Sequence, residues 1–77
     1  MEISIGEYCQ FTLRGKMSLI DQYGKFECLK VFDKKRITVF KLFDFHVEVV
    51  RDLLTKEIVQ ANPITSKSLL EFYNLIG

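Results

Sequence analysis

The chain has 77 residues, of which 48% are hydrophobic, 13% aromatic and 27% charged, a composition typical of one ordinary globular domain. Two independent cores cannot be built from so short a chain, because small domains bury a low fraction of their surface, so a large multi-site enzyme is excluded. Eleven Lys and Arg residues and ten Asp and Glu residues give a net charge of +1. A charge so close to zero does not indicate a protein that binds polyanions or acidic membranes.

The first part of the chain, residues 1–43, is rich in Ile, Val, Thr, Tyr and Phe and is punctuated by turn formers. This texture predicts an antiparallel meander of about four strands. Apolar and polar residues alternate between Glu7 and Leu13, which favours a strand with one apolar face. Arg14 and Gly15 then mark a bend. The expected strands are residues 7–13, 16–20, 25–32 and 36–43.

The last two expected strands are apolar on both faces. Residues 21–24 suit a type I turn, with Asp first and Gly last, and residues 33–35 form the next turn. The alternation within 25–32 slips in the middle, as in a bulge or a strand buried on both sides. In an antiparallel sheet with one face exposed to solvent, hydrophobic and polar residues alternate more regularly along each strand. The second face is therefore expected to be covered by closure into a small barrel, by the C-terminal helix or helices, or by another protein chain.

Residues 44–62 fit two structures. A helix would begin at Asp44 and end at Asn62–Pro63, and its apolar stripe has spacings of three and four. A strand would use the alternation of residues 43–49, where β-branched content is high. The helix is favoured because its stripe persists along the segment, and a strand over 45–51 with a hairpin to 57–61 is the alternative. The stripe consists of Val47, Val50, Leu54, Ile58 and Ala61.

The final segment is predicted to be an amphipathic helix. Thr65 or Ser66 can cap it, and apolar residues follow at i, i+3, i+4 and i+7. The expected fold is therefore α+β in a single domain, residues 1–77, with a β-rich part over 1–43 and a mainly helical part over 44–77. In it, a curled or small-barrel-like N-terminal sheet is covered by one or two C-terminal helices. The residues of the apolar helix surface are Leu69, Leu70, Phe72, Tyr73, Leu75 and Ile76.

The sequence predicts a cytoplasmic protein without membrane association. Its first residues have no basic region followed by a long apolar run, so no secretory signal is expected. Charged residues interrupt every hydrophobic segment before the roughly 18 to 20 residues that a membrane span needs. Cys9 and Cys28 are then expected to be reduced and buried as small apolar side chains.

Enzyme activity is the least supported class of function. The four glycines are too far apart for a phosphate-binding loop. His46 is the only histidine, so any nucleophile and base pair would depend on it. Cys9, Cys28 and His46 have no short spacing of the kind that zinc sites use. We expect no catalytic residues, no cofactor and no metal.

The charge is unevenly distributed along the chain. Residues 1–43 carry eight basic and five acidic groups, a net of +3, whereas residues 44–77 carry three basic and five acidic groups, a net of −2. Basic residues among aromatic ones on a small sheet are typical of single-stranded nucleic-acid binding. The ribonucleoprotein octapeptide pattern is absent, so this function is the alternative. Its candidate contacts are Lys25, Lys34, Lys35, Arg36 and Lys41.

Excess apolar surface favours a protein-interaction module. Strands apolar on both faces and a broad apolar helix together present more apolar surface than so short a chain is expected to bury by itself. The main hypothesis is therefore a small non-enzymatic regulatory or adaptor protein that binds a partner, or itself, through the terminal helix or a strand edge. Replacement of Tyr73 by Glu would then disrupt assembly and leave a folded monomer, whereas loss of folding would place Tyr73 in the core. The candidate interface residues are Leu69, Leu70, Phe72, Tyr73 and Ile76.

Overall fold

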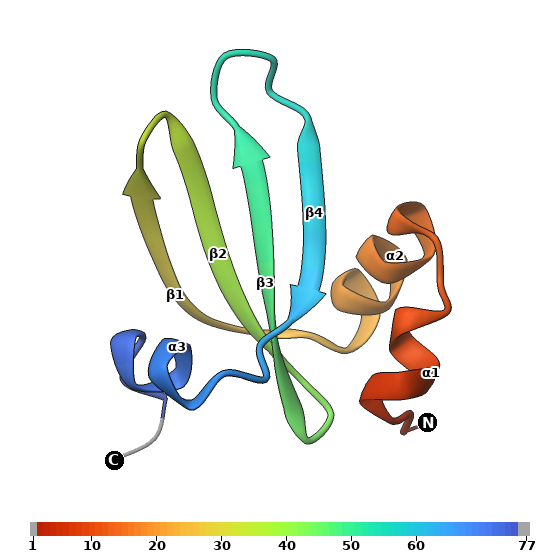
Figure 1. Cartoon of the computed structure of the whole chain (residues 1–77). Coiled ribbons are helices and arrows are strands. Elements are labelled where there is room, and N and C mark those ends of the chain that lie inside the picture. Colours follow the sequence, from red (N-terminus) through yellow and green to blue (C-terminus); the bar gives the residue numbers. More distant parts are fainter. Residues whose placement is uncertain (1, 76–77) are drawn as a thin grey trace.

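Short helices flank a four-stranded sheet in the computed structural model, which describes residues 2–75 (Figure 1). The sheet is an antiparallel meander in chain order, so β1 and β4 are its two edges. The α+β class and an antiparallel meander of four strands are confirmed, but the meander follows two helices instead of forming the N-terminal part of the chain, and only two of its strands are among the four predicted. The sheet is open, and the predicted curling into a small barrel is wrong. The elements are α1 (Ile5–Cys9), α2 (Leu13–Tyr23), β1 (Lys25–Phe32), β2 (Lys35–Leu42), β3 (Phe45–Asp52), β4 (Ile58–Pro63) and α3 (Lys67–Phe72).

The first two predicted strands, residues 7–13 and 16–20, are wrong, because the first segment covers the end of α1, a turn and the start of α2, and the second lies within α2. Side-chain caps explain the difference. Ser4 Oγ accepts the N–H of Glu7 at 3.2 Å, and Glu7 Oε1 accepts the N–H of Ser4 at 2.9 Å, a reciprocal capping box at the start of α1. Thr12 caps α2 by accepting the N–H of Gly15 at 3.1 Å.

The helix favoured for residues 44–62 is also wrong, and the alternative hairpin is confirmed as β3 and β4. The alternating residues Phe45, Val47 and Val49 are buried on one face of the sheet. The burial gained by this strand outweighs the apolar spacing of three and four residues that favoured a helix. Leu54, a member of the supposed helical stripe, lies 75% exposed in the loop between the strands. The β-rich part of the chain therefore spans residues 25–63, and the predicted division into 1–43 and 44–77 is wrong.

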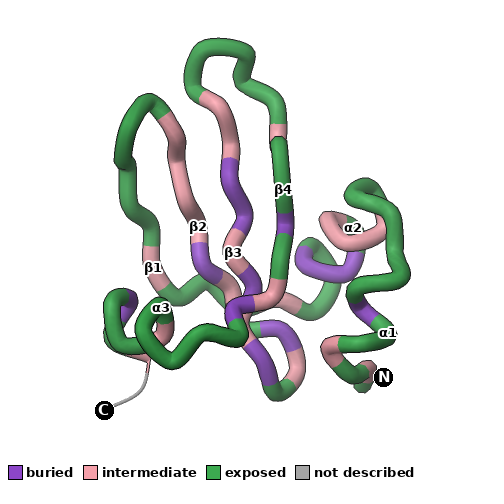
Figure 2. Tube along the Cα trace, in the orientation of Figure 1, coloured by how far each residue is buried: buried purple, intermediate pink, exposed green. Residues whose placement is uncertain are grey.

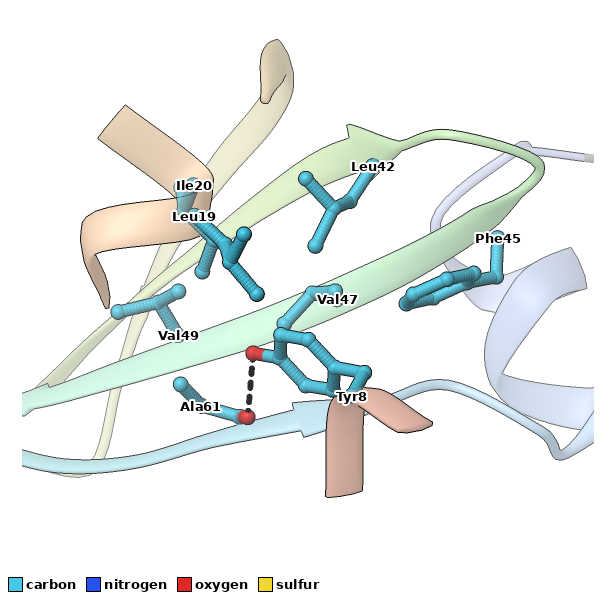
Figure 3. Packing of buried hydrophobic residues seen from close by; sticks show 8 residues of the cluster. All are labelled: Tyr8, Leu19, Ile20, Leu42, Phe45, Val47, Val49 and Ala61. Carbon is cyan, nitrogen blue, oxygen red and sulfur yellow. Dashed lines mark hydrogen bonds between the residues drawn. The ribbon is translucent and has the colours of Figure 1, made fainter. Parts of the chain in front are cut away.

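The main core lies between the sheet and the two N-terminal helices (Figure 3). Tyr8 of α1 and Leu19 and Ile20 of α2 pack on buried residues of β2, β3 and β4. The ring of Tyr8 meets the ring of Phe45 edge-on, with 5.6 Å between centroids. Helix α2 contacts β2 and β4, and α1 contacts β4. We call this side of the sheet the α2 face.

The opposite side of the sheet, the α3 face, is covered in part by the C-terminal helix. Ser66 caps α3, as expected. Tyr73, which follows the helix, packs with Val39 and Ile64 in a second buried cluster, and half-buried Cys28 lies against it. Buried positions accordingly occur on β2 and β3, while β1 is exposed along most of its length (Figure 2). Within residues 2–75, no helix has the length and apolar character needed to cross a membrane.

Candidate protein-binding surface

Strand β1 has no buried residue, although its sequence is largely apolar. Phe26, Leu29, Val31 and Phe32 are 61%, 47%, 62% and 72% exposed. A strand that is paired on one side normally buries the side chains of at least one face. The exposure of four large apolar residues on one edge strand therefore marks this part of the surface as unusual.

The pairing register assigns these side chains to the two faces of the sheet. Leu29 lies opposite Thr38 and Val31 opposite Arg36, so Leu29 and Val31 belong to the α2 face. Cys28, Lys30 and Phe32 belong to the α3 face, where Cys28 lies opposite the buried Val39. The register shifts at Glu27, a bulge, so the regular part of β1 is residues 28–32.

A groove of about 440 Å³ lies between β1 and α3 on the α3 face, and its walls are mainly apolar. Its size is within the range of sites that bind ligands or partner side chains. The ammonium group of Lys30 lies 5.3 Å from the centroid of the Phe72 ring, a cation–π contact across the groove. The groove is lined by residues that include Lys30, Phe32, Ile37, Leu69, Phe72 and Tyr73.

The five residues predicted from sequence as a protein interface do not share one environment. Leu69 and Phe72 are exposed at the groove, whereas Leu70 is half-buried against the second cluster. Tyr73 is 6% exposed, and its hydroxyl donates a hydrogen bond to Glu48 Oε2. Burial and this hydrogen bond raise the pKa of Tyr73 above its usual value. Ile76 lies outside the described residues.

The opposite edge of the sheet is built differently. The hydroxyl of Tyr8 donates to the carbonyl oxygen of Ala61 on β4 at 2.8 Å, in a buried hydrogen bond. The register also shifts between the Gln60 and Ile58 pairs, so that Val59 has no partner on β3. Pro63 at the end of β4 has no N–H to offer. A helix contact, a bulge and a proline are devices that prevent another strand from pairing with an edge.

The residues predicted to contact nucleic acid form two separate groups. Lys25 and Lys41 lie directly opposite each other at one end of the β1–β2 hairpin. They line a pocket of about 350 Å³ together with the rings of Tyr23 and Phe43. The second group lies at the other end of the hairpin, five to seven residues from Lys41 along the chain, a separation of roughly 17–23 Å. This group is Lys34, Lys35 and Arg36.

The groups considered for catalysis or metal binding are dispersed. His46 Nε2 on β3 lies 3.9 Å from Glu27 Oε1 on β1, so this contact joins two side chains on the surface of the sheet. Burial raises the pKa of the Cys28 thiol, with partial opposition from Lys30, whereas Cys9 is exposed, contrary to prediction. Across residues 2–75, no three His, Cys, Asp or Glu side chains are grouped so as to hold a metal ion.

A strand edge was one of the predicted binding surfaces, but none of the predicted interface residues belongs to β1, because the place of this apolar strand at the edge of the sheet was not predicted. One signal was available in residues 28–32, where a central Lys30 has two apolar residues on each side. An edge strand with this pattern presents apolar groups on both faces, and Lys is common on free edges. Comparison with known proteins adds no assignment: no family model, curated protein or solved structure matches this chain.

Proposed function

We propose that this protein is a non-enzymatic binding module, of the regulatory or adaptor kind, that holds a partner protein along β1 and the adjoining groove. The observation that supports this proposal is that none of the eight residues of β1 is buried. An edge strand presents unpaired N–H and C=O groups, onto which an extended segment of a partner adds as a further strand. Side chains of β1 then contact the partner on both faces of the sheet.

The adjoining surface supplies contacts that an isolated edge would lack. Leu69 and Phe72 of α3 are exposed beside the groove, next to Phe32 of β1. Aromatic and aliphatic side chains around an apolar groove are the groups that most often contribute binding energy at protein interfaces. The two edges of the sheet also differ, because β4 is protected and β1 is free, which supports one binding edge for each molecule.

Nucleic-acid binding is the second candidate function. Two cross-strand lysines, Lys25 and Lys41, lie beside the aromatic rings of Tyr23 and Phe43, an arrangement that suits a stacked base and its phosphate. It ranks lower because the remaining basic candidates lie at the opposite end of the hairpin. Titration of labelled single-stranded oligonucleotides at two salt concentrations tests it. Binding that weakens steeply with salt and depends on Lys25 and Lys41 would support it.

Site-specific photo-crosslinking tests the main proposal. A photoreactive phenylalanine analogue replaces Phe32 on β1 in one variant and Leu54 in the β3–β4 loop in a control. The two positions are 72% and 75% exposed, so they are equally open to chance encounters. In an extract of the source cells, we expect a discrete adduct from position 32 that excess unmodified protein prevents. The same diffuse background from both positions would count against the proposal.

A further inference from the structure

We propose that the partner held by β1 is a second copy of this chain, paired antiparallel through residues 28–32 about a twofold axis at Lys30. This inference rests on the function proposed above and identifies its partner. The axis is perpendicular to the sheet, so the two four-stranded sheets form one continuous sheet of eight strands. Both copies of α2 then lie on one face and both copies of α3 on the other.

The sequence of β1 is self-complementary in this register. Residues 28–32 read Cys-Leu-Lys-Val-Phe, with two apolar residues on each side of Lys30. Antiparallel pairing centred on Lys30 places Leu29 opposite Val31 of the second copy on the α2 face. On the α3 face it places Cys28 opposite Phe32 of the second copy. Each apolar pair occurs twice because of the symmetry, and cross-strand pairs of this kind stabilise sheets.

Neighbouring registers are less favourable. If the pairing shifted by one residue, a residue of the α2 face would lie opposite a residue of the α3 face of the second copy. Directly opposite residues in one continuous sheet must share a face, so this register cannot form. A twofold axis at Leu29 would place Val31 opposite the bulged Glu27 and Cys28 opposite Lys30. A twofold axis at Val31 would place Leu29 opposite Asp33 and Lys30 opposite Phe32. Only the axis at Lys30 matches apolar residues with apolar residues on both faces.

The two central Lys30 residues are the main cost of this register, because like charges directly opposite each other destabilise a sheet. The structure reduces this cost. The ammonium group of Lys30 lies over the Phe72 ring, 5.3 Å from its centroid, so its charge is directed towards α3 of its own chain. The side chain of Phe32 from the second copy lies on the same face and adds apolar surface beside the groove.

The protected β4 edge makes this assembly a closed dimer. Tyr8 bonds to Ala61 of β4, and Val59 forms a bulge there, so a third chain has no comparable edge to extend. Isologous pairing through β1 uses the one free edge of each copy and leaves none over. The bulge at Glu27 limits the paired segment to residues 28–32.

Sedimentation velocity of the wild-type protein from low to high micromolar concentration tests whether the dimer forms. We expect a shift from monomer to dimer, and in Val31→Lys a rise of at least about tenfold in the dissociation constant. Val59→Lys is the matched control, because Val59 is also an exposed strand valine, 49% exposed on the other edge. It retains the wild-type shift. A wild-type monomer at every concentration would overturn the proposal.

Disulfide trapping tests the register. In a Cys9→Ser background, Phe32→Cys places a thiol at position 32 opposite Cys28 of the second copy, and mild oxidation is expected to give a covalent dimer. Adding Cys28→Ser removes the partner thiol, and the two introduced thiols at position 32 are then about 13 Å apart along the strands. That control is expected to stay monomeric on a denaturing gel. A covalent dimer in both variants, or in neither, would contradict a twofold axis at Lys30.

The two proposals fail in different ways. If the protein is monomeric but position 32 gives a specific adduct of another mass in the cell extract, self-pairing is wrong and the binding function stands. If neither a dimer nor an adduct forms, both are wrong.

Discussion

The hydroxyl of Tyr8 donates a hydrogen bond of 2.8 Å to the carbonyl oxygen of Ala61, a residue 53 positions further along the chain. Tyr8 is fully buried, and the bond is enclosed by the main core (Figure 3). It fixes α1 against β4 and occupies a main-chain acceptor of that edge strand. The N-terminal helices thus protect one edge of the sheet, while β1 at the other edge is open to a partner.

Replacement of Tyr8 by Phe is expected to lower the free energy of unfolding by about 1–3 kcal/mol, because the Ala61 carbonyl then loses its buried donor. Urea denaturation followed by circular dichroism measures the change. Tyr23→Phe is the control, since Tyr23 is 39% exposed and makes no hydrogen bond within residues 2–75. A Tyr8→Phe protein as stable as the Tyr23→Phe protein would show that the bond contributes nothing.

Stability is expected to fall in alkali. Burial raises the pKa of Tyr8 and Tyr73 above the usual 10.0 in the folded protein. The folded state then retains protons that the unfolded state loses, so the stability they confer is complete below pH 10 and is lost as the pH rises towards their folded pKa values. Each tyrosine contributes a slope of up to about 1.4 kcal/mol per pH unit.

Urea denaturation at a series of pH values from 8 to 11 checks this dependence. Lysines also titrate in alkali, so the double variant Tyr8→Phe and Tyr73→Phe serves as the control. We expect the double variant to show a shallower decline than the wild type above pH 10. Parallel curves for the two proteins would mean that these tyrosines ionise as readily in the folded state as in the unfolded one.

The parts of the fold that sequence alone predicted are those set by local chemistry. The β1–β2 hairpin and the Ser66 cap of α3 follow from turn and capping residues. The N-terminal helices were missed although Ser4 and Glu7 have the spacing of a capping box. The alternation from Glu7 to Leu13 was the misleading signal, because Phe11 and Leu13 on that supposed apolar face are exposed.

The parts of the fold and of the binding surface that the sequence did not predict depend on tertiary packing. Residues 45–52 contain signals for a helix and for a strand, and burial of Phe45 and Val47 against Tyr8 selects the strand. The binding surface depends on strand order. An apolar strand such as β1 belongs to a core when it is central and to the surface when it is an edge, and its apolar content alone does not distinguish the two. The sequence therefore predicted excess apolar surface and named a strand edge as one binding surface, but the interface residues chosen from it all lie between positions 69 and 76, and none lies on β1.

Two glycine substitutions are expected to act in opposite directions. At Gly24, which ends α2, an added Cβ would lie 2.7 Å from the carbonyl oxygen of Ile20, a contact that only a shift of the backbone could relieve. Gly24→Ala should lower the free energy of unfolding by about 1–3 kcal/mol. At Gly6, inside α1, an added Cβ would meet only Ser4 Oγ at 3.8 Å, an ordinary van der Waals contact. Gly6→Ala should raise stability by about 0.5–1 kcal/mol.

Thermal and urea unfolding of both glycine variants provide the measurement, with the wild type between them in stability. The pair is informative because the substitution is chemically identical and the surroundings alone differ. A stabilised Gly24→Ala protein would mean that a Cβ at position 24 does not clash with the carbonyl oxygen of Ile20.

Adjacent aromatic residues at the end of α3 are expected to respond differently to the same substitution. Tyr73 is 6% exposed and Phe72 is 62% exposed. Tyr73→Glu would bury a carboxylate beside Glu48, which now accepts the tyrosine hydrogen bond, and is expected to cost about 3–5 kcal/mol. Phe72→Glu is expected to change stability by less than about 1 kcal/mol and to weaken partner binding at the groove.

Circular dichroism and urea denaturation separate these outcomes, and the photo-crosslinking assay at position 32 reports on binding. Loss of folding in Tyr73→Glu would place Tyr73 in the core and remove it from the predicted interface. A folded Phe72→Glu protein with reduced adduct formation would assign Phe72 to the binding surface, since the change leaves the second buried cluster intact. If instead Tyr73→Glu folds normally, the contact of α3 with Val39 and Ile64 does not hold this helix on the sheet.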